Sequence, residues 1–300
     1  MTAAGDNVAG TTVSQTVTGM AAALAAAGFG DARREARVLA AIALEVEPLD
    51  LLTAPERTLT PAERSRIGGA LARRLAGEPA SRIRGRREFW SLDFAIAPAV
   101  LDPRPETELL VELALAHAQS NARRLMARTA AGPLRILDLG TGSGCILLSL
   151  LQELPGSTGI GIDVSPPALA VARANAASLG LESRAGWVCG RWFGPLCGGF
   201  DLITGNPPYI PAGHVATLGR GVRNFDPALA LDGGPDGLAA YRMIIPDLPG
   251  FLRPSGGAFL EVGAGQAGMV AAMARRHGLR PQIRPDLAGI PRAVALLTEF

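Results

Sequence analysis

The sequence predicts an α/β protein with a doubly wound, mostly parallel, seven-stranded sheet, preceded by a small helical domain. Three observations predict it. Strand and helix patterns alternate from residue 134 to the end of the chain, and this alternation builds parallel sheets. No strand pattern occurs before residue 89. The 300 residues are 48% hydrophobic, which is enough for a sizeable core in one large or two modest domains.

The N-terminal part of the chain has helical periodicity. Residues 1–15 lack a basic region followed by an apolar core, so we expect a disordered tail and not a signal peptide. Residues 16–84 form the predicted helical domain, with helices over 17–27, 31–46 and 60–76. The third helix begins at Thr60-Pro61-Ala62-Glu63, which combines a capping box with proline at the first helical position.

The sequence pattern of residues 85–103 predicts two short strands, which we interpret as a β-hairpin linking two domains. The second domain covers 104–300 and opens with a helix near Glu106. Residues 210–237 are rich in Gly, Pro and Asp, and we expect a long loop that covers the substrate. The predicted strands of the sheet lie near 134–138, 159–163, 185–189, 200–204, 257–262, 280–284 and 293–298.

Composition limits the possible partners. The 29 basic and 27 acidic residues give a net charge of +2, which does not support nonspecific nucleic-acid binding. Three cysteines without C-x-x-C spacing predict buried thiols in a reducing compartment, hence a cytoplasmic protein, and neither zinc nor disulfides. No apolar run approaches the roughly 18 residues of a membrane span. We expect a monomer that binds neither membranes nor nucleic acid directly.

A glycine loop lies between the first predicted strand of the sheet and the helix that follows it. Its sequence is Asp138-Leu139-Gly140-Thr141-Gly142-Ser143-Gly144, and glycines let a backbone approach a ligand closely at a helix N-terminus. Asp163 ends the next strand, about 20 positions on, where an acidic residue usually binds ribose hydroxyls. The third glycine falls one residue early for a dinucleotide fingerprint, and Asp138 suits a cationic amino acid better than a pyrophosphate. The spacing therefore favours an S-adenosyl-L-methionine-dependent methyltransferase over a dehydrogenase.

The segment Asn206-Pro207-Pro208-Tyr209 follows the predicted strand near 200–204. Two prolines cannot continue a strand ladder, so the chain leaves the sheet here, at the strand end where open α/β sheets bind ligands. The Asn206 side-chain oxygen and the Pro207 carbonyl can each accept one N–H of a planar –NH2 group, and Tyr209 can lie against its face. Taken alone, the segment fits a proline-rich turn capped by Asn206 about equally well.

With these motifs together, the chain resembles the release-factor glutamine methyltransferases (the HemK/PrmC family). The resemblance runs from about residue 73 to 300, with a similar helical domain before it. The residues that carry it are Gly77-Glu78-Pro79, Gly85-Arg86-Arg87-Glu88-Phe89-Trp90, Pro103-Arg104-Pro105-Glu106-Thr107-Glu108, the glycine loop, Asn206-Pro207-Pro208-Tyr209 and Leu229-Ala230-Leu231-Asp232-Gly233-Gly234.

The resemblance implies a Rossmann-like methyltransferase sheet and a substrate. That substrate is the glutamine of the Gly-Gly-Gln motif in class I peptide chain release factors, methylated on its side-chain amide nitrogen (N5), with residues 16–84 recognising the release factor. It also implies site residues: Gly140, Thr141, Gly142, Ser143 and Gly144 at the methionine end of the cofactor, Asp163 at the ribose, Trp192 near the adenine, and Asn206, Pro207, Pro208 and Tyr209 at the glutamine amide.

One departure from the family pattern concerns the adenine. Members often carry an acidic residue just before the tryptophan, but this chain has Arg191, which cannot accept a hydrogen bond from the adenine amino group. A backbone carbonyl could accept it instead. The family's acidic residue in another stretch is present, as Asp226 of Val222-Arg223-Asn224-Phe225-Asp226-Pro227.

Several alternatives stay open at this point. The same motif serves amino-group methyltransferases that act on nucleic-acid bases, and a ribosomal-protein glutamine would need the same chemistry as a release factor. A catalytically silent binding module is a third alternative. Glu106 and Glu108 fit stabilisation of a helix N-terminus and shaping of the pocket better than a role as a base. Glu261 ends a predicted strand, where it either faces the cofactor side or caps the next helix.

Overall fold

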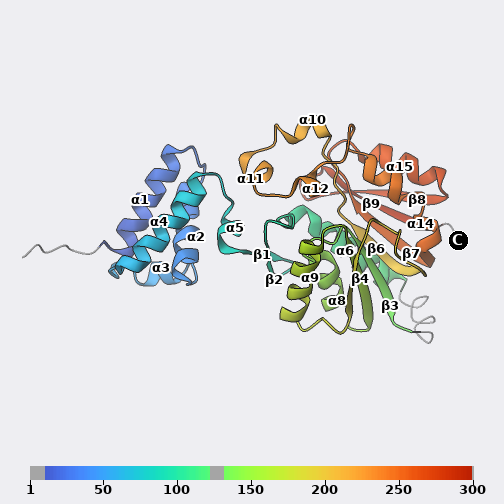
Figure 1. Cartoon of the computed structure of the whole chain (residues 1–300), viewed down its shortest axis with the longest axis horizontal. Helices are drawn as coiled ribbons and strands as arrows, with labels where there is room; N and C mark the ends of the chain where they lie inside the picture. Colours follow the sequence, from blue (N-terminus) through green and yellow to red (C-terminus); the bar gives the residue numbers. More distant parts are fainter. Residues whose placement is uncertain (1–10, 122–131, 299–300) are drawn as a thin grey trace, which may run out of the picture. The chain divides into compact units, whose positions relative to one another are not determined.

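The computed structural model describes residues 11–121 and 132–298. The chain splits into two compact units, Met1–Arg84 and Gly85–Phe300, which are drawn from blue to red in Figure 1. Each unit has its own hydrophobic core. None of the helices in the described part of the chain is long and apolar enough to cross a bilayer.

The named elements of the first unit are all helices where it is described, with one isolated antiparallel bridge between Thr12 and Thr58. Leu24, Leu39, Leu59 and Ile67 are buried together in its core. Thr60 and Glu63 form the predicted capping box at the start of the third long helix. The helices are α1 (Val13–Ala26), α2 (Ala32–Leu44), α3 (Asp50–Thr53), α4 (Pro61–Leu75) and α5 (Ala80–Arg84).

Helix α1 begins earlier than the sequence predicted. The Thr12 hydroxyl accepts a hydrogen bond from the Gln15 backbone N–H at 3.2 Å, and the Gln15 side chain accepts one from the Thr12 N–H at 3.0 Å. This reciprocal pair is a capping box. The expected tail over 1–15 is therefore wrong for its last residues, while residues 1–10 lie outside the described part of the chain.

The predicted hairpin opens the second unit. Strands β1 (Arg86–Phe89) and β2 (Leu92–Ala95) pair antiparallel. Trp90 and Ser91 form the turn with φ of +53° and +56°, the left-handed values of a tight hairpin. The Trp90 backbone N–H donates to the Glu108 carboxylate at 2.8 Å, which ties the turn to the start of α6 (Glu108–Ser120).

The second unit contains the predicted seven-stranded sheet. The strand order is β5-β4-β3-β6-β7-β9-β8, with β9 antiparallel to its two neighbours and the other pairs parallel. All seven strands occur close to their predicted positions. They are β3 (Leu134–Leu139), β4 (Ser157–Asp163), β5 (Ala185–Cys189), β6 (Phe200–Gly205), β7 (Leu252–Glu261), β8 (Leu279–Pro285) and β9 (Pro291–Thr298).

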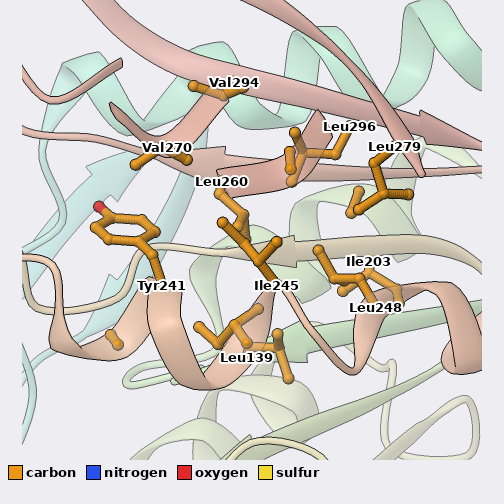
Figure 2. Close-up of a cluster of buried hydrophobic side chains, with 14 of the residues drawn as sticks. Leu139, Ile203, Tyr241, Ile245, Leu248, Leu260, Val270, Leu279, Val294 and Leu296 are labelled. Atoms are coloured by element: carbon orange, nitrogen blue, oxygen red, sulfur yellow. The ribbon is translucent and has the colours of Figure 1, made fainter. Parts of the chain in front are cut away.

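The two faces of the sheet are covered by two separate hydrophobic clusters. Successive strand residues alternate between them: Ile136 and Leu202 belong to one cluster, and Leu137 and Ile203 to the other. The first face packs against α6 and α8 (Cys145–Glu153), and the second against α13 (Ala239–Ile244), α14 (Leu248–Phe251) and α15 (Ala267–Arg276). Figure 2 shows Tyr241, Ile245 and Leu248 packed beside Leu139, Ile203 and Leu260 on the second face. The sheet is therefore buried on both faces, as is usual for mostly parallel sheets.

The order in which successive strands are added to the sheet reverses at β3. Strands β3, β4 and β5 follow one another outward on one side, whereas β6 returns to the other side of β3. Leu139 pairs with Gly205 at the carboxyl ends of β3 and β6, so Gly140 and Asn206 leave the sheet next to each other. Such a switch point is where open α/β sheets bind ligands.

The predicted loop over 210–237 contains local helical structure. Three single-turn helices occur in it: α10 (Ala212–Val215), α11 (Arg220–Arg223) and α12 (Ala228–Leu231). Ile210 also forms an isolated parallel bridge with Asp232. Each helix is only four residues long, so no helical periodicity can accumulate in the sequence, and glycine and proline dominate the pattern.

Candidate active site

A cavity of about 440 Å³ lies at the carboxyl ends of the central strands. Its size falls in the range of roughly 300–1,000 Å³ that is usual for small-molecule sites. Eight of the eleven predicted site residues line it: Gly140, Thr141, Gly142, Ser143, Asp163, Trp192, Asn206 and Pro208. Gly144, Pro207 and Tyr209 do not line it. The structure thus brings the glycine loop and the first residue of the Asn-Pro-Pro-Tyr segment to one cavity.

The glycine loop has the backbone shape that its composition predicts. Gly140, Gly142 and Gly144 have φ of +68°, +55° and +80°, values that L side chains rarely adopt. The Gly140 and Thr141 N–H groups donate to the Ile162 carbonyl at 2.9 and 3.0 Å, which anchors the loop to β4. A Cβ built at Gly140 lies 3.8 Å from the Trp192 ring.

Gly144 does not line the cavity and has a packing role. It caps α8, and a Cβ at this position would lie 3.0 Å from Trp187, 3.2 Å from Leu148 and 3.3 Å from Ala172. The third glycine of the loop is therefore required where α8 approaches the neighbouring side chains.

Asp163 lies at the cavity and holds two backbone groups. One carboxylate oxygen accepts the Gly142 N–H at 3.0 Å, and the other accepts the Ser165 N–H at 2.9 Å. A carboxylate offers about four lone-pair sites, so two further donors can still be accepted. Ribose hydroxyls are such donors.

Trp192 forms part of the cavity wall in an unusual backbone conformation, with φ of +50°. Its indole nitrogen is buried and has no hydrogen-bond partner among the described residues. A buried N–H without an acceptor costs about 1–3 kcal/mol. The neighbouring Arg191 is exposed and also lines the cavity.

Asn206 belongs to a hydrogen-bond chain that crosses three elements. Its side-chain Nδ2 donates to the Thr107 hydroxyl at 3.2 Å, and Thr107 donates to the Glu261 carboxylate at 2.6 Å. The Tyr209 hydroxyl donates to the other Glu261 oxygen at 3.2 Å. Thr107 lies in the 3₁₀ turn η1 (Pro105–Thr107), and Glu261 ends β7.

The carboxyl group of Glu261 is buried at the centre of this chain. Burial raises its pKa to about 7, although the hydroxyls of Thr107 and Tyr209 act in the opposite direction. Burial and the nearby Glu261 also raise the pKa of Tyr209, so its hydroxyl remains a donor at neutral pH. Glu261 contacts Thr107 and Tyr209 and does not cap the helix after β7, whose N-cap is Gln266.

Asp138 lies beneath the loop and not in the cavity lining. It is fully buried, and its two oxygens accept the hydroxyls of Thr141 at 2.7 Å and Thr204 at 2.8 Å. Burial raises the pKa of Asp138 to about 6. These two contacts hold the glycine loop against β6.

The sequence did not single out several residues of the site. Val100, Leu101 and Met243 supply apolar walls, and no motif marks them. Leu229 also lines the cavity, and it lies in the Leu229-Ala230-Leu231-Asp232-Gly233-Gly234 segment, although no role of its own was predicted for it. Arg104 also lines the cavity, and its guanidinium binds Asp226 at 2.6 Å. The Arg-Pro-Glu-Thr-Glu block was the available signal for Arg104 and Thr107, but it gave no reason to connect them with Asp226 or Glu261.

The cavity fits S-adenosyl-L-methionine. Left-handed glycines line its wall, Asp163 has acceptor capacity for a ribose, and the Trp192 side chain supplies an aromatic surface. No cluster of three or more His, Cys, Asp or Glu side chains within 11–121 and 132–298 could hold a metal ion.

The chain is similar in sequence to known families and proteins. Residues 15–85 match the family model of the PrmC N-terminal domain, and residues 132–206 match a methyltransferase domain. A release factor glutamine methyltransferase of Rhodospirillum rubrum is 46% identical, over 90% of this chain and 80% of the relative. Those of Bradyrhizobium diazoefficiens and Moorella thermoacetica are 45% and 42% identical, over 92% and 90% of this chain and 91% and 92% of theirs.

Solved structures support the fold alone. The hMettl16 catalytic domain matches with a TM-score of 0.53 at 17% identity, over 83% of this chain and 86% of that one. A methyltransferase from Pyrococcus furiosus matches with a TM-score of 0.50 at 14% identity, over 78% of this chain and all of that one (100%). Both likenesses agree with the Rossmann-like methyltransferase sheet.

Proposed function

This chain belongs to the release factor glutamine methyltransferase family, and we propose that it methylates the side-chain amide nitrogen (N5) of the Gly-Gly-Gln glutamine in class I release factors. The observation that carries the proposal is the presence of Asn206 on the same cavity as the glycine loop, at adjoining strand ends. Family membership favours this substrate over the ribosomal-protein and nucleic-acid alternatives.

The chain's own residues have a positioning task. An amide nitrogen is a poor nucleophile because its lone pair is delocalised, so the geometry of the approach is decisive. In this proposal Asn206 Oδ1 accepts one N–H of the glutamine amide and the Pro207 carbonyl accepts the other. Tyr209 limits the movement of the group, since its hydroxyl is held by Glu261. Fixing both hydrogens aims the nitrogen toward the glycine loop.

S-adenosyl-L-methionine, when bound, supplies a methyl group on a positively charged sulfur. Gly140, Gly142 and Ser143 would lie along it where they line the cavity, and Asp163 would accept hydrogen bonds from its ribose. Trp192 would cover the adenine. The apolar residues Val100 and Met243 line the same space, and apolar surroundings strengthen the polar contacts inside it.

The first unit would recognise the release factor. Its match to the PrmC N-terminal domain supports this role. The cavity is lined by residues of the second unit, so no described residue of the first unit takes part in lining it. We further propose that residues 85–103 link the two domains, and that the protein works as a monomer in the cytoplasm, where translation ends. Size-exclusion chromatography with light scattering tests the monomer, and fractionation tests the compartment.

The proposed function is tested by mass spectrometry of a release factor incubated with the protein and isotope-labelled S-adenosyl-L-methionine. We expect one added methyl group on the Gly-Gly-Gln glutamine. A release factor with that glutamine changed to glutamate is the matched control, and it should gain no methyl there because a carboxylate has no N–H for Asn206 to bind. Methylation of the glutamate, or of another residue only, would contradict the proposal.

A further inference from the structure

We infer that Glu261 is a positioning residue that acts through the Thr107 hydroxyl to hold the Asn206 amide with Oδ1 toward the cavity. The inference rests on the proposed function, since it concerns how the glutamine amide is recognised. It also gives a role to Thr107, the buried threonine of the Arg-Pro-Glu-Thr-Glu block.

The argument begins with the single proton of the Thr107 hydroxyl. An ionised carboxylate can only accept, so the 2.6 Å contact with Glu261 Oε2 uses that proton. The Thr107 oxygen is then an acceptor toward its other neighbour. The Asn206 atom that lies 3.2 Å away must therefore be the amide nitrogen. Asn206 Oδ1 is left free to accept an N–H from the substrate.

The carboxylate is itself held on both sides. Glu261 Oε1 accepts the Tyr209 hydroxyl at 3.2 Å, and the Glu261 backbone carbonyl accepts the Tyr241 hydroxyl at 2.7 Å. Glu261 and Thr107 are each only 3% exposed. With its backbone fixed and both oxygens engaged, the side chain of Glu261 has little freedom to turn.

The direction of the hydrogen bonds that connect Glu261, Thr107 and Asn206 depends on the charge of Glu261. A protonated carboxyl can donate to Thr107, and Thr107 can then donate to Asn206 Oδ1, which turns the –NH2 group of Asn206 toward the substrate. That orientation sets one amino group against another. The groups facing Glu261 are the Thr107 and Tyr209 hydroxyls, with Arg292 and Glu106 as the nearby charges. Burial places the pKa of Glu261 at about 7, so the productive orientation is favoured above neutral pH.

The kinetic test compares two substitutions of Thr107. Thr107→Val keeps the shape but removes the hydroxyl, and we expect kcat for the release factor to fall about tenfold with cofactor affinity unchanged. Thr107→Ser keeps the hydroxyl and should retain most of the activity. Equal kcat values for the two variants in an active enzyme would overturn the inference while leaving the proposed function intact.

A second measurement needs no activity. The chain has five asparagines, so protein labelled with ¹⁵N-asparagine gives few side-chain amide signals, and Asn206→Ala identifies the pair that belongs to Asn206. We expect this pair to shift as the pH crosses about 7, to lose that dependence in Glu261→Gln, and to move in Thr107→Val.

The two readouts separate the two claims. If the wild-type protein transfers no methyl group to the release factor, the proposed function fails, yet the amide signals still decide the inference. An Asn206 pair that is independent of pH and unchanged in Thr107→Val overturns the inference, even if Glu261→Gln does not fold.

Discussion

At the scale of single residues, the site depends on where the chain leaves the sheet. Leu139 and Gly205 are paired at the ends of two parallel strands, and the next residue of each strand lines the cavity. The backbone turns sharply at both places, with a left-handed glycine after one strand and two prolines after the other. The glycine loop and Asn206 therefore adjoin because two strand ends are neighbours in the sheet.

Asn206→Ala should separate binding from turnover. The Asn206 side chain is one of many that line the cavity of about 440 Å³. We therefore expect calorimetry to give nearly normal affinity for S-adenosyl-L-methionine. Turnover should fall roughly 10²-fold or more, the usual loss for one preorganised polar contact. Near-normal methyl transfer in this variant would mean that Asn206 does not hold the amide.

The loop glycines should differ in what they contribute. Gly144→Ala brings a Cβ to 3.0 Å from Trp187, whereas a Cβ at Gly142 meets nothing closer than the Gly140 carbonyl at 4.0 Å. Both positions carry the cost of a left-handed alanine. We expect urea unfolding to show Gly144→Ala losing about 1–3 kcal/mol more than Gly142→Ala, with cofactor affinity reduced mainly in the latter. Equal losses of stability would argue against packing at Gly144.

At the scale of elements, an ion pair connects the segment before η1 to the segment that contains α10, α11 and α12. The Asp226 carboxylate is 1% exposed, binds the Arg104 guanidinium at 2.6 Å and accepts the Asp102 N–H at 3.2 Å. Leu229, Ala230 and Asp232, which follow it, line the cavity. The pair therefore holds one wall in place.

Asp226→Ala should loosen that wall. It leaves the Asp102 N–H and a partly buried guanidinium without this acceptor, at a cost of about 2–4 kcal/mol. We expect faster amide hydrogen exchange across 220–235 and weaker cofactor binding. Arg242→Ala is the matched control, because its ion pair with Asp236 is exposed on both sides and should add little. Unchanged exchange in Asp226→Ala would contradict this role.

The strands that could be predicted closely from sequence are short segments with buried apolar residues that end at or next to a glycine or an acidic motif residue. Strands β3, β4 and β6 lie within two residues of their predicted limits. Strand β7 begins at Leu252, five residues before its prediction, since Pro254, Ser255 and Gly256 resemble a turn. Helix α1 begins at Val13 because its capping box uses Gln15, which composition does not distinguish from a polar tail.

At the scale of the whole molecule, the site is harder to predict than the fold. The glycine loop and Asn206 lie in short motifs beside strands, so local sequence reveals them. The contact between Thr107 and Glu261 joins residues 154 positions apart, and neither residue type is distinctive by itself. The folded chain brings η1 to the end of β7, and no local pattern in the sequence indicates this contact.

The buried carboxyl of Glu261 should make stability depend on pH. Its pKa is raised from 4.5 to about 7, so the folded state binds the proton more tightly than the unfolded chain does. Stability therefore falls as the pH rises from 4.5 to 7. Relative to Glu261→Gln, the wild type should lose up to about 3 kcal/mol in its free energy of unfolding over this interval. Chemical denaturation at several pH values measures the free energy of unfolding of both proteins. A difference between them that does not change with pH would contradict the raised pKa of Glu261.

The position of Trp192 gives the molecule an optical signal of its own. Only three tryptophans are present, and this one has its ring against the glycine loop at the cavity wall. Indole emission responds to the polarity and stacking of its surroundings, so the intrinsic fluorescence of the unlabelled protein can follow occupancy of the site in a stopped-flow instrument.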